Sequence, residues 1–126
     1  MFRNLFEQEP KAVMTFPAGA AIFREGDRGA AMFGVISGEV DLFIGNVVLE
    51  IVGPGMVFGE MALIEDDVRS ASASARTDCR LVQIDLAAFD VLTVSNPGFA
   101  RQLMKVMAGR LRRMNSRVMD RSDPTF

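Results

Sequence analysis

Residues 58–73 read FGEMALIEDDVRSASA, a glycine turn followed by a short apolar helical run, an acidic loop and an arginine that opens a strand. The free backbone N–H groups at the start of a one-turn helix, here residues 59–63, form an anion-binding end. Arg69 can add a bidentate contact to a phosphate. Because a carboxylate repels a phosphate, Glu60 is best explained as the acceptor for a hydroxyl beside that phosphate, as on a sugar. A phosphate next to a sugar hydroxyl indicates a nucleotide.

This stretch resembles the phosphate-binding cassette of cyclic nucleotide-binding domains, whose pattern is roughly F-G-E-x-A-L, a loop, and R-x-A-[ST]. The resemblance implies that Glu60 accepts a hydrogen bond from the ribose 2′-hydroxyl, that Arg69 binds the cyclic phosphate, and that Ser70 contacts phosphate or base. Val68 departs from the family, which often has proline there, and this changes the loop's stiffness more than its chemistry. The ligand-binding residues implied in this stretch are Phe58, Gly59, Glu60, Met61, Ala62, Leu63, Arg69, Ser70 and Ala71.

The same stretch has a simpler interpretation, an ordinary hairpin with a surface Glu–Arg pair. An isolated FGE would favour that interpretation, but sixteen residues in pattern favour the cassette. Arg69 also heads an alternating run to Arg76 that predicts a strand, and an inward-pointing charge is costly unless it has a partner. Residues 70–75 have the composition of a flexible linker. Their flanks, Arg69 and residues 79–82, favour a strand instead.

Length and composition indicate one domain that carries no metal. The chain has 126 residues and is 49% hydrophobic, enough for one packed core, so we expect a single domain over residues 1–126. It contains one cysteine, Cys79, and no histidine, so we expect no disulfide, no common metal site and no cofactor. No apolar run approaches ~20 residues, and acids lie where a signal peptide would be apolar. We therefore expect a cytoplasmic chain without a transmembrane segment.

Short apolar runs predict an antiparallel β fold. They recur every 8–12 residues with glycine turns between them, and no helical stretch long enough for parallel crossovers intervenes. Gly45-Asn46 is a two-residue hairpin link. This spacing matches the family's jelly-roll-like β-roll, so we expect a barrel over about residues 12–85, with a short cassette helix. The predicted strands are residues 13–16, 21–24, 30–36, 40–44, 47–52, 69–76 and 79–84, and the turn glycines expected at positive φ are Gly26, Gly38, Gly53 and Gly55.

Helices are predicted at both ends. A short packing helix is expected over residues 1–9, and Asp85 is the expected N-cap of a helix over residues 86–95. A second helix starts near Pro97 and has an apolar stripe that faces either the barrel or a partner. The stripe consists of Met104, Met107, Leu111, Met114 and Val118.

The last helix is also basic. Residues 1–100 hold seven basic and fourteen acidic side chains, whereas residues 101–126 hold seven basic and two acidic. Such a tail can bind nucleic acid or acidic lipid, although docking on the acidic body or a solvated face is the simpler interpretation. The family resemblance places a base-capping residue at Arg110, whose guanidinium can stack on a purine. The alternative is that Arg110 only belongs to the basic face, with Arg112, Arg113 and Arg117.

The resemblance covers about residues 12–118 and implies a sensor that binds cAMP, and cGMP more weakly, while its C-terminal helices close over the base as a lid. Ser70 stands where members favouring cGMP often have threonine. Within these residues we expect neither the DNA-reading domain of family transcription factors nor the tandem copy of kinase regulatory subunits. The expected partners are therefore an unknown effector protein or a fused effector domain, such as that of a prokaryotic cyclic nucleotide-gated channel, and a second copy through the C-terminal helix.

Two other classes of function remain open. A hydrolase would call for metals or a general acid–base pair, which a chain without histidine does not readily supply, and Cys79 could act as a nucleophile only with a base beside it. Its apolar strand favours a core position. A degenerate β-roll that serves only for interaction or dimerisation, without binding nucleotide, is the main alternative. The intact pair of Glu60 and Arg69 argues against it.

Overall fold

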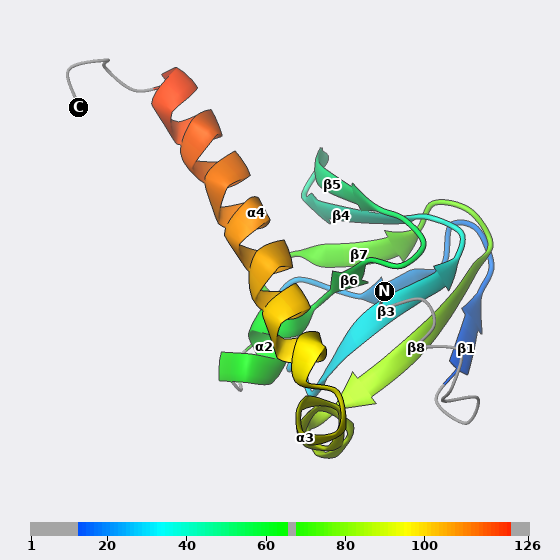
Figure 1. Ribbon diagram of the computed structural model, residues 1–126. Coiled ribbons are helices and arrows are strands. Elements are labelled where there is room, and N and C mark those ends of the chain that lie inside the picture. The colour runs from blue at the N-terminus through cyan, green and yellow to red at the C-terminus, as the bar shows by residue number, and fades with distance from the viewer. Residues whose placement is uncertain (1–12, 66–67, 122–126) are drawn as a thin grey trace. The chain divides into compact units, whose positions relative to one another are not determined.

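The computed structural model describes residues 13–65 and 68–121 (Figure 1). The chain forms two compact units, Met1–Val91 and Leu92–Phe126. The first unit contains all the strands of the described residues and the short helix α2, and the second contains the long helix α4. The helix predicted over residues 1–9 lies outside the described residues.

The strands of the first unit form two antiparallel four-stranded sheets, in the orders β1-β8-β3-β6 and β2-β7-β4-β5. The predicted class, mainly antiparallel β with helices, is confirmed. The expectation of a barrel is corrected, because the two sheets are not closed into one. The strands are β1 (Val13–Phe16), β2 (Ala21–Phe23), β3 (Ala31–Ser37), β4 (Val40–Ile44), β5 (Val47–Val52), β6 (Val57–Phe58), β7 (Ser72–Ala75) and β8 (Cys79–Asp85).

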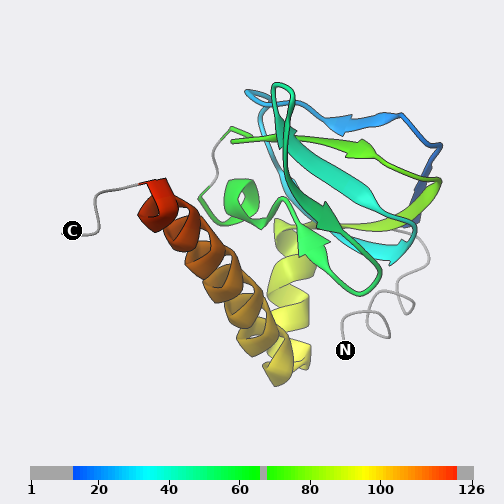
Figure 2. The same cartoon turned by 90° about the horizontal axis from the view of Figure 1, so that it is seen from above.

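Short edge strands explain why the sheets stay separate. Three of the four edge strands, β1, β2 and β6, are only four, three and two residues long, which leaves little backbone to pair across the gap. The sheets instead face each other across a shared core, in the manner of a sandwich (Figure 2). That core consists of Phe33, Val35, Val40, Val52, Phe58, Ala73, Ala75, Cys79 and Leu81.

The central strand β3 reads AMFGVIS, and its first six residues are all buried. A run without polar alternation is typical of a strand covered on both faces. Its neighbour β8 buries Leu81, Val82 and Ile84 and exposes Arg80, Gln83 and Asp85, so it also buries residues on both faces but has exposed positions between them.

Two local predictions differ from the structure: the start of a strand and the conformation of a turn glycine. Strand β7 begins at Ser72 rather than at Arg69, because the backbone of Arg69 is bonded to the turn at residues 24–28 instead of to the sheet. Gly53 does not have positive φ, whereas Gly26, Gly38 and Gly55 do, as predicted. The reason is the turn type: Met56 N–H donates to the carbonyl of Gly53, so the third residue, Gly55, takes the left-handed position.

The helix predictions hold for the described residues. Helix α3 (Leu86–Ser95) is capped by Asp85, whose carboxylate accepts a hydrogen bond of 2.8 Å from the N–H of Ala88. Helix α4 (Pro97–Arg121) opens on a proline, which suits the first turn of a helix. In the predicted apolar stripe, Met104 and Leu111 are 61% and 59% exposed. No helix of the described residues combines the length and apolarity needed to cross a bilayer.

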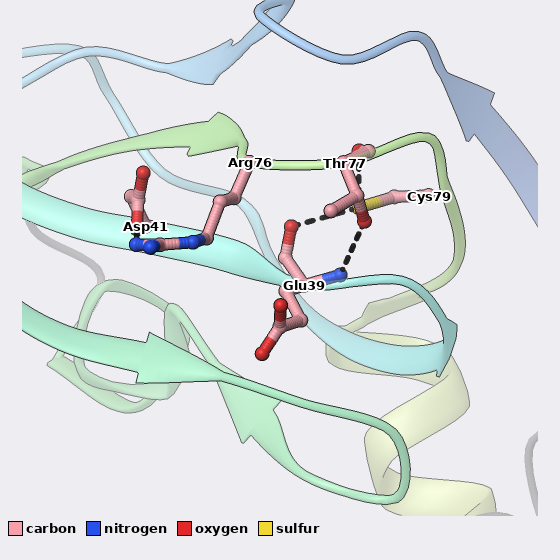
Figure 3. Close-up of polar contacts among 5 residues, drawn as sticks. All are labelled: Glu39, Asp41, Arg76, Thr77 and Cys79. Atoms are coloured by element: carbon pink, nitrogen blue, oxygen red, sulfur yellow. Dashed lines mark hydrogen bonds and ion pairs between the residues drawn. The ribbon is translucent and has the colours of Figure 1, made fainter.

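A network of polar contacts ties the turn after β3 to the turn after β7 (Figure 3). The N–H of Glu39 donates to the hydroxyl of Thr77 over 3.0 Å, and the carbonyl of Glu39 accepts from the N–H of Arg76 over 2.9 Å. Arg76 also forms an ion pair of 3.2 Å with Asp41. The Cys79 thiol donates to the Glu39 carbonyl, and burial raises the pKa of this thiol. Cys79 is therefore a core residue, as its strand predicted.

Gly38 lies at the tightest point of this network, which makes its replacement costly. Its φ is +85°, and a Cβ there would strike the Asp78 carbonyl and lie 2.9 Å from the sulfur of Cys79. Gly19 has nearly the same φ, +89°, but open space around it. We predict that Gly19→Ala lowers the free energy of unfolding by only about 1–2 kcal/mol, the cost of placing alanine in the left-handed conformation. Gly38→Ala should cost about 1–3 kcal/mol more, measured by urea unfolding, because it adds a steric clash. Equal losses of stability in the two variants would contradict the close packing around Gly38.

Candidate functional site

The predicted cassette begins where β6 ends. Gly59 has a φ of +77°, and helix α2 (Glu60–Glu65) starts at the next residue. A Cβ on Gly59 would lie 2.7 Å from Nη1 of Arg69. Glycine is therefore required at this position both for its conformation and for the close approach of the arginine.

Arg69 is buried, with a relative exposure of 6%, and main-chain oxygens hold its side chain. Its Nη1 donates to the carbonyl of Gly59 over 2.8 Å, and its Nη2 donates to the carbonyl of Ala31 over 2.6 Å. Burial lowers the pKa of Arg69, and the nearby charges of Asp27 and Glu60 oppose that shift. Arginine nevertheless stays protonated, because its pKa is far above neutrality.

Two further residues complete the surroundings of the guanidinium. Its Cζ lies 4.1 Å from the centroid of the Phe23 ring, on β2. A Cβ on Gly29 would meet the Cβ of Ala62 and lie 2.7 Å from Nε of Arg69. Phe23, Gly29, Ala31 and Gly59 therefore form the walls of a guanidinium slot, the name used below for these four residues.

A turn at residues 24–28 braces the backbone of Arg69. The N–H of Arg69 donates to the carbonyl of Asp27 over 2.7 Å, and the carbonyl of Arg69 accepts from the N–H of Gly26 over 2.9 Å. Ser72, at the start of β7, accepts from the N–H of Glu25 over 2.9 Å. The carboxylate of Asp27 closes the turn on itself by accepting from the N–H of Arg24.

Glu60 is the second buried charged side chain beside this slot, with a relative exposure of 3%. It occupies the first turn of α2, where the helix dipole favours a negative charge. Its charge acts on Arg69, opposing the shift that burial produces. An acid and a base are thus buried close together, so the site offers one strong acceptor and one cationic set of donors.

The structure brings several of the sequence-predicted residues together and separates others. Gly59 contacts Arg69, Ala62 and Arg69 both lie close to Gly29, and the charge of Glu60 acts on Arg69. Leu63 is buried in α2, whereas the side chain of Phe58 belongs to the core, stacked on Phe33 at 5.4 Å. The remaining first-unit positions face outward to differing degrees: Met61 and Ser70 are exposed and Ala71 is half-buried.

Arg110 lies on α4, in the second compact unit, where its side chain is half-buried. Sequence reasoning missed the residues that hold Arg69 in place, namely Phe23, Asp27, Gly29 and Ala31. The EGD turn at residues 25–27 was the one visible signal, since glycine followed by aspartate marks a tight turn. Within residues 13–65 and 68–121, no three metal-ligating side chains gather at one place.

Comparison with known proteins gives one consistent result. The family model for the cyclic nucleotide-binding domain matches residues 13–96. A CRP-like cAMP-activated global transcriptional regulator of Mycobacterium tuberculosis is 35% identical over an alignment of 112 residues that covers 83% of this chain and 49% of that protein. A cyclic nucleotide-gated potassium channel of Mesorhizobium japonicum is 43% identical over 96 residues, covering 76% of this chain and 26% of the channel.

A solved structure shows the same architecture. The crystal structure of the Thermus thermophilus catabolite activator protein matches with a TM-score of 0.77 and 35% identity, over 84% of this chain and 52% of that one. The chain thus spans about half, or less, of the length of these relatives.

Proposed function

The chain belongs to the cyclic nucleotide-binding domain family, and from this premise we propose that it is a sensor that binds a cyclic nucleotide without transforming it. The observation that carries the proposal is the presence of two buried charges that act on each other, Arg69 in the guanidinium slot and Glu60 at the start of α2. The names of the relatives describe regulators and channels, which supports binding rather than catalysis.

In this proposal Arg69 binds the cyclic phosphate. Its two hydrogen bonds to carbonyls leave other N–H donors for phosphate oxygens. The backbone around Gly59, Ala62 and Leu63 adds donors at the start of α2, and Glu60 accepts from the ribose 2′-hydroxyl. Ser70, exposed beside Arg69, contacts phosphate or base. The remaining residues of the cassette, Phe58, Met61 and Ala71, are proposed to line the ligand site through their main-chain atoms or exposed surface.

We propose cAMP as the preferred ligand, with cGMP bound more weakly. Two observations support this preference. The mycobacterial relative is named as cAMP-activated, and Ser70 stands where a threonine hydroxyl often favours cGMP. A serine hydroxyl keeps a contact to guanine available, so the preference should be modest.

We further propose that the two compact units act as one domain, in which α4 closes over the base and Arg110 stacks on it. The basic composition of α4 and the planar, weakly hydrated guanidinium support this role. The signal would pass to an effector protein or a fused effector domain, or to a second copy through α4. A cytoplasmic location follows from a ligand that is an intracellular messenger.

The direct test of phosphate binding is Arg69→Ala. Truncating one partner of a buried charge pair costs about 2–5 kcal/mol. At about 1.4 kcal/mol per tenfold, cAMP affinity should fall at least about 30-fold by calorimetry. Arg76→Ala is the matched control, since Arg76 lies at the other end of β7, is exposed and pairs with Asp41. The cAMP affinity of Arg76→Ala should not change. Unchanged affinity in Arg69→Ala would remove the phosphate role.

Glu60→Gln tests the contact with ribose. A carboxylate is a stronger acceptor for a hydroxyl than an amide oxygen, so the advantage of cAMP over 2′-deoxy-cAMP should shrink in the variant. Competition binding with both nucleotides measures this preference. Glu39→Gln, at an exposed turn residue, is the control and should keep the preference of the parent protein. If parent and variant keep the same preference, Glu60 braces the loop instead of binding the sugar.

Hydrogen exchange tests the lid. If α4 contacts bound nucleotide, cAMP should slow exchange over residues 97–118, because a ligand shifts a population only by contacting one state better. Arg110→Ala should weaken binding, whereas Arg112→Ala, at an exposed neighbouring position, should not. Unchanged exchange together with full affinity in Arg110→Ala would rule out the lid.

A further inference from the structure

Phe23 reaches Arg69 because β2 is irregular. The strand pairs with β7 through Ala21 with Ser74 and Phe23 with Ala73, so its register shifts between these two pairs. Such a bulge re-aims the side chain that follows it. The ring of Phe23 lies against the Arg69 guanidinium and also packs near the core rings of Phe33 and Phe58.

The core rings limit where the Phe23 ring can go. Its centroid is 6.0 Å from that of Phe33 and 5.9 Å from that of Phe58, while those two rings stack at 5.4 Å. Three mutually packed rings form a rigid surface, since cores are close-packed. Phe33 itself is more distant from the charge, with 5.9 Å between its centroid and Cζ of Arg69, against 4.1 Å for Phe23.

Several uncharged groups of the described residues hold the guanidinium. Its two hydrogen bonds go to the carbonyls of Gly59 and Ala31, and the Phe23 ring lies against it. A ring face attracts a cation through its quadrupole and uses none of the N–H donors. These partners therefore hold the guanidinium without neutralising it, and the charges of Asp27 and Glu60 act on Arg69 in addition.

Two glycine backbones also approach the guanidinium closely. A Cβ on Gly59 would lie 2.7 Å from Nη1 and 3.4 Å from Cε2 of the Phe23 ring, and one on Gly29 would lie 2.7 Å from Nε. The guanidinium is thus confined between a ring and two glycine backbones. Loss of the ring would open the slot on the side that Phe23 closes.

We infer that Phe23 is a positioning residue for ligand binding: its ring, set by the bulge in β2 and braced by the core rings, fixes the Arg69 guanidinium in the orientation that receives the phosphate. This inference rests on the proposed function and deepens it. It assigns part of the ligand's affinity to a residue 46 positions away in the chain that does not touch the ligand.

The test combines two measurements on Phe23→Leu, which removes the ring but keeps an apolar side chain. The first is a double-mutant cycle of urea unfolding without ligand, with Arg69→Ala as the second change. A cation–π contact corresponds to about a 2- to 30-fold change in the folding equilibrium constant, so the cycle should show a coupling of that size. Phe33→Leu, at the more distant ring, is the matched control and should show less coupling.

The second measurement is cAMP affinity of the folded proteins by calorimetry. Phe23→Leu should bind about 2- to 30-fold more weakly than Phe33→Leu, because only the former frees the guanidinium. Phe23→Met, unbranched and adaptable, replaces Phe23→Leu if that protein does not fold. Absence of coupling, or coupling with equal affinity in the two ring variants, would overturn the inference. A parent protein that does not bind cAMP would instead defeat the proposed function, while the unfolding cycle still reports the contact.

Discussion

A positive charge buried among carbonyl oxygens and an aromatic ring is the constraint on which the rest of this structure depends. Moving a charge out of water is costly unless the protein supplies partners, and here they come from three segments, residues 23–28, Ala31 and Gly59. Ala31 and Gly59 supply carbonyls, Phe23 supplies a ring, and the turn at residues 24–28 bonds the backbone of Arg69 on both sides. The two sheets and their core serve to bring these segments to one place.

The division between residues that bind and residues that position follows from this constraint. Arg69 and Glu60 carry the charges that a phosphate and a sugar hydroxyl would meet, and both are nearly fully buried. Glycines at positions 29 and 59 provide the close approach, since a Cβ at either would collide with the guanidinium. A site of this kind is preorganised: its arginine is oriented before a ligand arrives, so less freedom is lost on binding.

The sequence alone predicted the local parts of the site and fold. Phe58, Gly59, Glu60 and Arg69 fall within sixteen residues, so their spacing is readable, and the Gly45-Asn46 hairpin and the Asp85 cap are local signals as well. The slot is not local. Phe23 and Ala31 are 46 and 38 positions from Arg69, and their role follows from strand pairing and a bulge that no short pattern encodes. The start of β7 likewise depends on tertiary hydrogen bonds, and the separation of the sheets on the lengths of their edge strands.

The central claim is that the charge of Arg69 is held ready for a cyclic phosphate, and calorimetry with two ligands tests it most directly. Adenosine shares the base and ribose of cAMP but lacks the phosphate, so comparison of the two on the unmodified protein isolates the phosphate contact. We expect cAMP to bind at least about 30-fold more tightly than adenosine, given the cost of leaving a buried charge without its partner. Equal affinity for the two, or no binding of cAMP, would contradict the claim.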